Sequence, residues 1–235
     1  MRLGKNDELE FDVTNDVKQL GVKGAYFVLD FDPEKANLGK ISSLLGETMQ
    51  QIRDDRPDLK EDQILTGFRD LHTTVGVSNR KHISSPENLI ELILAGRNLP
   101  SINPIVDVYN IVSLQTRLAL GAHDTDRLEG PIALRLTNGT EDFTPLGSPE
   151  KKVIGAGEYG YIDEGCNEVI CRLETRQCEK TKVSGSSKTC FFIVEGNKNT
   201  EADYIKDAVT KLQALLVECC GANQAEKIYW QISGS

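Results

Sequence analysis

The chain has 235 residues, of which 39% are hydrophobic and 27% charged, and its formal net charge is −9. These values are ordinary for a globular protein with a sizeable core, and the negative charge counts against indiscriminate nucleic-acid binding, because affinity for phosphates rests mainly on Lys and Arg. The longest apolar runs fall far short of the roughly 20 residues that cross a bilayer, and no apolar segment of signal-peptide length follows Met1. We therefore expect a cytoplasmic protein with no membrane partner.

The first 98 residues are predicted to be mainly helical, with two strands. A short strand covers Leu9 to Val13, and a buried one covers Gly24 to Asp30. Helices begin at Asp32-Pro33 and Ser85-Pro86, where a capping residue precedes proline. A further helix covers Glu61 to Leu71. We interpret this part as a scaffold that leads into the centre of the chain.

A buried helix is predicted after Asn103-Pro104 and runs on through Leu120. Asn suits the N-cap, and Pro suits the first helical position, whose N–H has no intrahelical partner. The segment is apolar almost all round, which is typical of a buried helix. Asn103, Asp107 and Asn110 nevertheless share one face, at positions i, i+4 and i+7. Since buried polar groups need hydrogen-bond partners, these side chains contact either a ligand or nearby backbone.

From Pro131 the sequence changes to short strands separated by glycines. The strands are predicted at 131–136, 151–154, 158–162, 168–173 and 189–195. They indicate a mostly antiparallel sheet or a small barrel. One long helix from Thr200 to Gly221 and a last strand over 227–232 follow. The predicted fold class is α+β.

The six cysteines are scattered and form no Cys-x-x-Cys pair. Cys219 and Cys220 are adjacent at the end of a helix, and the other four lie among predicted strands. With only three histidines in the chain, no zinc pattern forms. We expect reduced, structural thiols, no metal and no cofactor.

Two central segments, LPSINPIVDVYNIVSL (99–114) and GAHDTDRLEGPI (121–132), resemble the B3/B4 domain of the phenylalanyl-tRNA synthetase beta chain. The resemblance continues more weakly at FTPLG (143–147) and FIVEG (192–196). It implies a single domain over 1–235, with a barrel-like, OB-like antiparallel β-core and flanking helices. The motif helix, the β-core and the C-terminal helix then occupy 99–235. Because no synthetase catalytic or anticodon-binding region fits in this length, we expect a free-standing relative.

In that family the domain lines a pocket that hydrolyses tyrosine wrongly attached to the phenylalanine tRNA. The sequence departs from the family pattern at two places. The family commonly has His-Ala-Phe-Asp where this chain has Gly121-Ala122-His123-Asp124, so that Gly121 stands at the His position. A Gly-Val-Met-Gly-Gly loop of the family is replaced here by residues 172–178. His123 is then the imidazole that the segment offers.

The resemblance implies candidate site residues around these motifs. The candidates for catalysis are His123 and Asp124. Those for substrate binding are Asp107, Asn110, His123, Asp126 and Glu129, and those for tRNA binding are Arg172, Arg176 and Lys182. A structural alternative stays open for each group: the helix polar groups can bond loop backbone, the acids can cap turns, and the basic residues can form a solvated strand face.

Three functions stay open at this point. The leading one is a tRNA-interacting domain that recognises an aminoacylated tRNA end and, if it is an enzyme, hydrolyses the aminoacyl ester in trans. The second is a module that binds an amino acid or another small molecule. The third is a non-catalytic interaction domain. The expected partner is tRNA or aminoacyl-tRNA, with a free amino acid as the alternative and no DNA.

Overall fold

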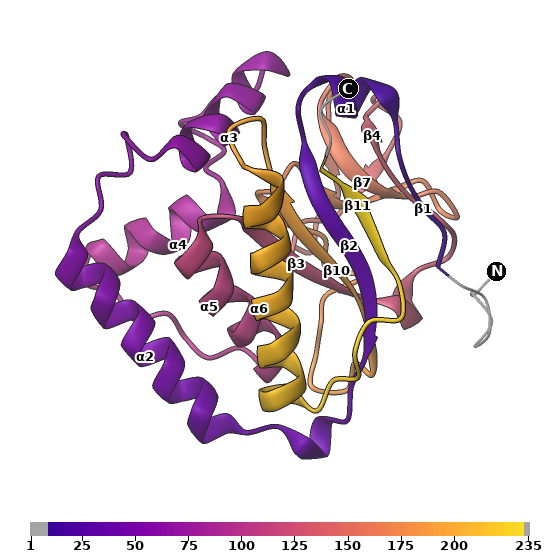
Figure 1. The fold of residues 1–235 in the computed structure, drawn as a ribbon. Coiled ribbons are helices and arrows are strands. Elements are labelled where there is room, and N and C mark those ends of the chain that lie inside the picture. The colour runs from indigo at the N-terminus through magenta and orange to yellow at the C-terminus, as the bar shows by residue number, and fades with distance from the viewer. Residues whose placement is uncertain (1–8, 233–235) are drawn as a thin grey trace.

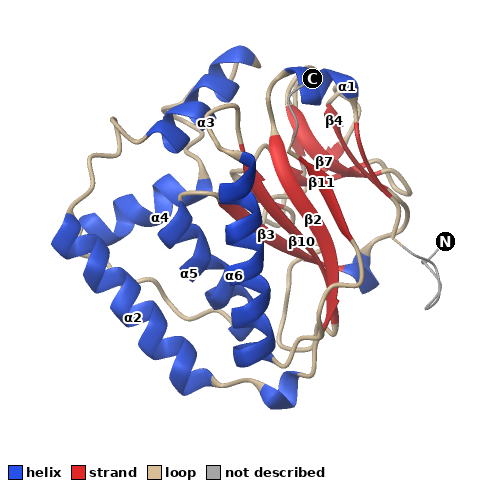
Figure 2. Ribbon diagram, in the orientation of Figure 1, coloured by secondary structure: helices blue, strands red, loops and turns tan. Residues whose placement is uncertain are grey.

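The computed structural model describes residues 9–232 and arranges them in three layers: helices, a first sheet and a second sheet (Figure 1). Figure 2 shows most of the helices gathered on one side of the strands. The order from helices to second sheet explains why two separate apolar cores exist, one on each face of the first sheet.

The first sheet is the central layer and has four antiparallel strands in the order β11-β2-β10-β3. Its longest strands, β2 and β10, pair along their whole length, from Thr189 opposite Asp30 to Gly196 opposite Lys23. The strands are β2 (Lys23–Asp30), β3 (Ala119–Asp124), β10 (Thr189–Gly196) and β11 (Ile228–Gln231). Because successive side chains point to opposite faces, each strand contributes to both cores.

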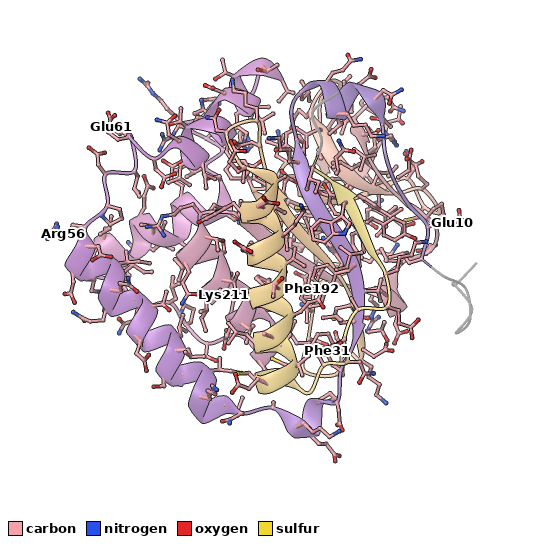
Figure 3. All side chains as sticks on the ribbon, viewed as in Figure 1. Glu10, Phe31, Arg56, Glu61, Phe192 and Lys211 are labelled. Carbon is pink, nitrogen blue, oxygen red and sulfur yellow. The ribbon has the colours of Figure 1, made fainter. Side chains whose placement is uncertain are left out.

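Helices cover one face of this sheet, and their apolar sides form the first core. They are α2 (Leu38–Asp55), α4 (Ser85–Leu94), α5 (Pro104–Thr116) and α6 (Ala202–Cys220). Phe31 and Phe192, labelled in Figure 3, lie on this side of the sheet. Their ring centroids are 5.8 Å apart. The remaining helical segments are α1 (Asn15–Gln19), α3 (Gln63–Thr74) and the short 3-10 turns η1 (Pro33–Lys35) and η2 (Thr125–Arg127).

The second sheet has seven strands and packs against the other face of the first. Its main path is β1-β4-β7-β8-β5-β6, and β9 pairs with β8. In the core between the sheets, Tyr26 of the first sheet packs against Tyr161 of the second and against Phe191 of its own sheet. The strands are β1 (Phe11–Val13), β4 (Ile132–Leu136), β5 (Asp142–Phe143), β6 (Lys152–Val153), β7 (Tyr159–Asp163), β8 (Glu168–Arg172) and β9 (Arg176–Gln177).

The α+β class is confirmed, but the barrel is not found. Within residues 9–232 the strands form two separate sheets, each with two edges, rather than one closed, OB-like barrel. The pairs β1–β4 and β5–β8 are parallel, so the second sheet is also not purely antiparallel. In addition, β1 and β2 from the first 98 residues join one sheet each, so this segment supplies strands as well as helices.

The central helix α5 begins where the sequence predicts it. The side chain of Asn103 accepts a hydrogen bond of 3.0 Å from the backbone N–H of Val106, and Pro104 is the first helical residue. The helix ends at Arg117, which has a left-handed φ of 63°. Ten of its thirteen residues are buried, as an apolar helix between α2, α6 and the sheet requires. No helix within the described residues is long and apolar enough to cross a membrane.

Candidate functional site

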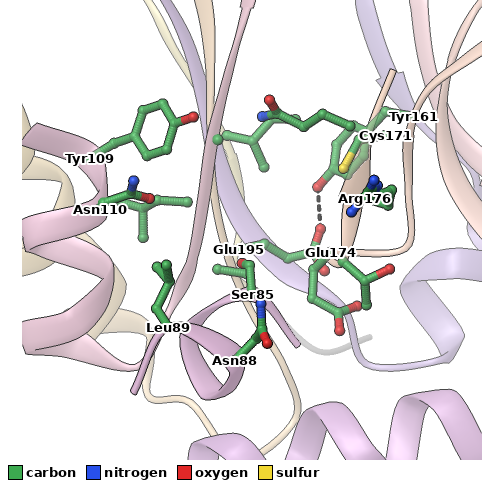
Figure 4. A pocket seen from close by; sticks show the side chains of 16 residues that line it. Ser85, Asn88, Leu89, Tyr109, Asn110, Tyr161, Cys171, Glu174, Arg176 and Glu195 are labelled. Carbon is green, nitrogen blue, oxygen red and sulfur yellow. Dashed lines mark hydrogen bonds between the residues drawn. The ribbon is translucent and has the colours of Figure 1, made fainter. Parts of the chain in front are cut away.

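A pocket with a cavity of about 160 Å³ lies at the β3 edge of the first sheet. Residues of α4 and α5 form one wall, and residues of β7, β8, β9 and β10 form the other (Figure 4). Cavities of about 150 Å³ in protein interiors admit a molecule the size of benzene. The pocket therefore has room for one amino-acid side chain or a small group of waters.

The helical wall offers an amide and a phenol to the pocket. Tyr109 and Asn110 project from α5, and Ser85, Asn88 and Leu89 come from the first turns of α4. Asn110 is half-buried in a helix that is otherwise almost wholly apolar. Its amide can donate and accept hydrogen bonds, so it is well suited to orient a ligand or a water.

The opposite wall contains a buried carboxyl group, Glu195. Glu195 alternates with Phe192 and Val194 along β10 and so faces the second sheet rather than the helices. Its Oε2 accepts a hydrogen bond from the hydroxyl of Tyr161, and its Oε1 lies 3.1 Å from the hydroxyl oxygen of Tyr159. Burial, reinforced by the nearby Glu174, raises the pKa of Glu195 to about 8.

A second buried carboxyl group, Glu174, lies next to the first. Its Oε2 accepts a hydrogen bond from Tyr159, and its Oε1 lies 2.6 Å from Nε2 of His72 on α3. Burial opposes the charged imidazole, but the hydrogen bond and charge of Glu174 outweigh it and raise the pKa of His72. The preceding residue, Leu173, has a φ of 51° with its side chain fully buried. Such strained backbone next to a pocket is typical of functional sites.

Arg176 is the basic residue that lines the outer part of the pocket. It is exposed, and its guanidinium donates to the backbone oxygen of Leu146 at 2.8 Å. Gln177, next to it, occupies the space in front of Gly121 on β3. A Cβ atom at Gly121 would lie 2.6 Å from the Gln177 side-chain nitrogen. The position where the family pattern has His therefore does fall on the pocket, and here an amide fills it.

The structure places the two candidates for catalysis away from this pocket. His123 is fully buried between the sheets, and its Nδ1 lies 2.7 Å from the hydroxyl of Thr181. Burial lowers its pKa to about 3, so the imidazole is neutral at pH 7. Asp124 accepts hydrogen bonds from the N–H of Asp126 and from the hydroxyl of Ser187.

Three acids predicted to bind substrate also lie outside the lining. The carboxylate of Asp107 is buried and accepts from the hydroxyl of Ser101 and from the N–H of Ile102, so it holds the loop before α5. Asp126 is exposed in η2. Glu129 is exposed and pairs with Lys180 at 2.7 Å. Of the predicted substrate-binding set, Asn110 lines the pocket.

The three basic candidates are divided in the same way. Arg176 lines the pocket, whereas Arg172 forms two hydrogen bonds, of 2.6 and 2.8 Å, to the carboxylate of Glu158. Lys182 is exposed and pairs with Glu179. No group of three or more His, Cys, Asp or Glu side chains within residues 9–232 is arranged to hold a metal ion.

The reasoning from sequence missed Glu174, Glu195 and the two tyrosines, and assigned His72 to the scaffold. One signal could have indicated Glu195. Glu195 directly follows Phe191-Phe192-Ile193-Val194, four residues that are all apolar. A lone carboxyl group in a strand buried on both faces needs partners, which marks it as a functional candidate.

Comparisons with known proteins agree with the central motif. The B3/4 domain family matches residues 69–221, which include every residue that lines the pocket and all of α5. The phenylalanine–tRNA ligase beta subunit of Malacoplasma penetrans (strain HF-2) is 28% identical over 123 residues. That match covers 52% of this chain and 15% of the relative.

A solved structure shares the fold. It is an N-terminal fragment of the phenylalanyl-tRNA synthetase beta-subunit from Pyrococcus horikoshii, with a TM-score of 0.50 and 15% sequence identity. The match covers 97% of this chain and 52% of that fragment. The chain thus spans about half of the solved fragment and a smaller share of the curated relative. On the match of the family over 69–221, the chain belongs to the B3/4 domain family.

Proposed function

We propose that this chain binds the aminoacylated end of a tRNA in the pocket and hydrolyses the ester bond there. The observation that carries the proposal is the position of the pocket: its lining runs from Ser85 to Glu195, within the segment that matches the B3/4 domain family. The relatives found are named as ligases or synthetases that act with tRNA. A free amino acid as the partner has no support in these comparisons.

The size of the pocket supports an aminoacyl group as the buried part of the ligand. A cavity of about 160 Å³ accepts one side chain and leaves no room for a nucleotide beside it. The RNA therefore stays outside, where Arg176 is exposed at the pocket. Guanidinium groups bind phosphate oxygens in a bidentate way, so Arg176 is suited to hold the terminal nucleotides.

The hydrolysis needs little chemistry from the protein, since an aminoacyl ester is already activated. A water attacks the ester carbonyl carbon, the bond from this carbon to the ribose oxygen breaks, and that oxygen takes up a proton. The products are a free amino acid and an uncharged tRNA. We assign Asn110 to orienting the ligand or the water, because its amide both donates and accepts. In this proposal His123 and Asp124 stabilise the fold.

Binding without hydrolysis is the second candidate. It is favoured by one observation: none of the described residues that line the pocket is a histidine, and Gly121 stands where the family pattern has one. Such a domain would hold the aminoacylated end and leave the ester intact. The two candidates predict the same RNA binding and differ in turnover.

The test is an ester-hydrolysis assay with purified protein and a panel of charged tRNAs that includes tyrosine-charged phenylalanine tRNA. We expect loss of one charged species, and we expect Asn110→Ala and Arg176→Ala to slow this loss. Lys182→Ala is the matched control, because Lys182 is a basic residue outside the pocket. If no species is lost but RNA binds and is released by salt, binding without chemistry is the function. If no RNA binds, both candidates are wrong.

A further inference from the structure

The buried acids form one continuous hydrogen-bonded row that reaches from the pocket to α3. The row runs from Tyr161 through Glu195, Tyr159 and Glu174 to His72. All five side chains are buried. Because a buried polar atom without a partner is costly, each oxygen and nitrogen contact in this row needs a proton between its two atoms.

At the outer end of the row, Asn79 fixes a hydrogen on Nδ1 of His72. The amide nitrogen of Asn79 donates to the backbone oxygen of Arg69 and to the hydroxyl of Thr73, at 3.1 and 3.2 Å. Its amide oxygen is thus the group that faces Nδ1 of His72, at 3.0 Å. Nδ1 must carry a hydrogen to donate to this oxygen. The contact from Nε2 to Glu174 needs a second hydrogen, and it lies on the ring because the hydrogen bond and charge of Glu174 raise the pKa of His72, which makes His72 an imidazolium.

The two contacts of Tyr159 require one more proton in the row. A phenol has a single hydrogen, yet the Tyr159 oxygen contacts Glu174 and also Glu195. If Tyr159 donates to Glu174, its contact with Glu195 lacks a hydrogen unless Glu195 supplies one. Glu174 is not the acid that holds this extra proton, because it faces the imidazolium of His72, whereas Glu195 faces neutral hydroxyls.

We propose that Glu195 is a neutral carboxylic acid in the resting protein and that this bound proton keeps the pocket open to an anionic ligand. The groups that face Glu195 are Tyr26 from β2, Tyr159 and Tyr161 from β7, Cys171 from β8, and Glu174 from the turn after β8. Of these, Glu174 alone is charged, and His72 balances it.

The proton matters because of charge. With Glu195 protonated, the carboxylate of Glu174 and the imidazolium of His72 sum to zero. Loss of the proton adds one negative charge to the pocket and offsets the attraction of Arg176 for phosphates, on a chain whose net charge is already −9. An RNA end carries negative phosphates and is repelled by that charge. This consequence rests on the proposed function, whereas the protonation of Glu195 does not.

The test of protonation needs no ligand. Infrared difference spectra between the wild-type protein and Glu195→Gln should contain the carbonyl stretch of a protonated carboxyl group at pH 6. That band should disappear with a midpoint near pH 8. Absence of the band at pH 6 would overturn the proposal.

A second variant tests the cause. Glu174→Gln removes the like charge and should lower the midpoint by about one pH unit or more. Glu47→Gln, on the exposed face of α2, should leave it unchanged. An unchanged midpoint in folded Glu174→Gln overturns the role of Glu174. If Glu174→Gln does not fold, the infrared difference between the wild type and Glu195→Gln still tests whether Glu195 is protonated.

The third measurement concerns the ligand and uses a short RNA that ends in the CCA sequence of tRNAs. Its affinity for the wild-type protein should fall about tenfold across the same midpoint, and its affinity for Glu195→Gln should not. Equal pH dependence in both proteins contradicts the electrostatic consequence. If the infrared band titrates but no RNA binds at any pH, the protonation stands and the proposed function is wrong.

Discussion

His72 on α3 and Glu174 in the turn after β8 are 102 residues apart in sequence, yet their side chains meet at 2.6 Å and are each 1% exposed. This contact joins the helical N-terminal segment to the wall of the pocket. A buried ion pair of this kind is costly to break, because the remaining partner keeps its charge without compensation. The stability of the fold and the geometry of the site are therefore linked at one point.

His72→Ala should lower the free energy of unfolding by about 3–5 kcal/mol, since it leaves Glu174 buried and unpaired. Urea denaturation followed by circular dichroism measures this change. The double variant with Glu174→Ala should cost less than the sum of the single variants. His82→Ala is the control: His82 is half-buried without such a pair and should cost less than about 1 kcal/mol. Equal losses of unfolding free energy in the two variants would show that the pair of His72 and Glu174 does not stabilise the fold more than an ordinary half-buried histidine does.

Part of the loss of stability with rising pH should be due to Glu195. Its pKa is about 8 in the folded protein and near 4.5 when unfolded, so unfolding between these values releases a proton. The contribution of Glu195 to the free energy of unfolding is fully present below pH 4.5 and is lost as the pH rises to 8. Glu195→Gln should remove this part of the decline, which denaturation curves at pH 5, 6, 7 and 8 measure. The pKa of His72 is also raised, so both the wild type and Glu195→Gln should lose further stability as the pH rises above 6.5.

Two glycines should respond differently to alanine. A Cβ atom at Gly165 would lie 2.4 Å from the backbone carbon of Glu129, and backbone there cannot move aside. Gly165→Ala should therefore cost about 1–3 kcal/mol. At Gly121 the Cβ atom meets the flexible end of Gln177, so Gly121→Ala should cost less than about 1 kcal/mol. Thermal melts of the two variants compare them, and the opposite order would contradict the packing described.

Asp107 should be a residue of stability rather than of activity. Its two carboxylate oxygens accept from Ser101 and Ile102, and it does not line the pocket. Asp107→Ala should lower the free energy of unfolding by about 1–3 kcal/mol, because it removes two hydrogen bonds to a carboxylate that hold the loop before α5. Hydrolysis per folded molecule should stay within twofold of the wild type. A large loss of activity in folded Asp107→Ala would place this carboxylate in the site.

The local parts of the fold could be predicted from sequence, because their causes are local. The pair Asn103-Pro104 specifies the start of α5, and the apolar residues that follow specify its burial. The closure of the strands could not be predicted in this way. Whether short strands form a barrel or two sheets depends on pairing between distant segments, such as β1 with β4, and no local pattern encodes it.

The site could be predicted only in part, because local patterns indicate single residues but not which distant segments come together. Asn110 and Arg176 lie in the segments that the sequence singled out, and both line the pocket. His123 was interpreted from its neighbours in sequence, but alternation along β3 turns its ring into the core between the sheets. The row from His72 to Glu195 unites three distant segments, so it became visible only when the sheets were in place.

The most direct test of the proposed function is to map where an aminoacylated RNA end binds. An amide-linked aminoacyl analogue of the tRNA terminus cannot be hydrolysed, so it can be titrated into isotope-labelled protein and followed by NMR. We expect the backbone signals of Asn110, Gly121 and Glu195 to change together and saturably, while those of Asp126 and Lys182 remain unaffected. Changes confined to residues outside the pocket, or no change at any concentration, would contradict the proposed function.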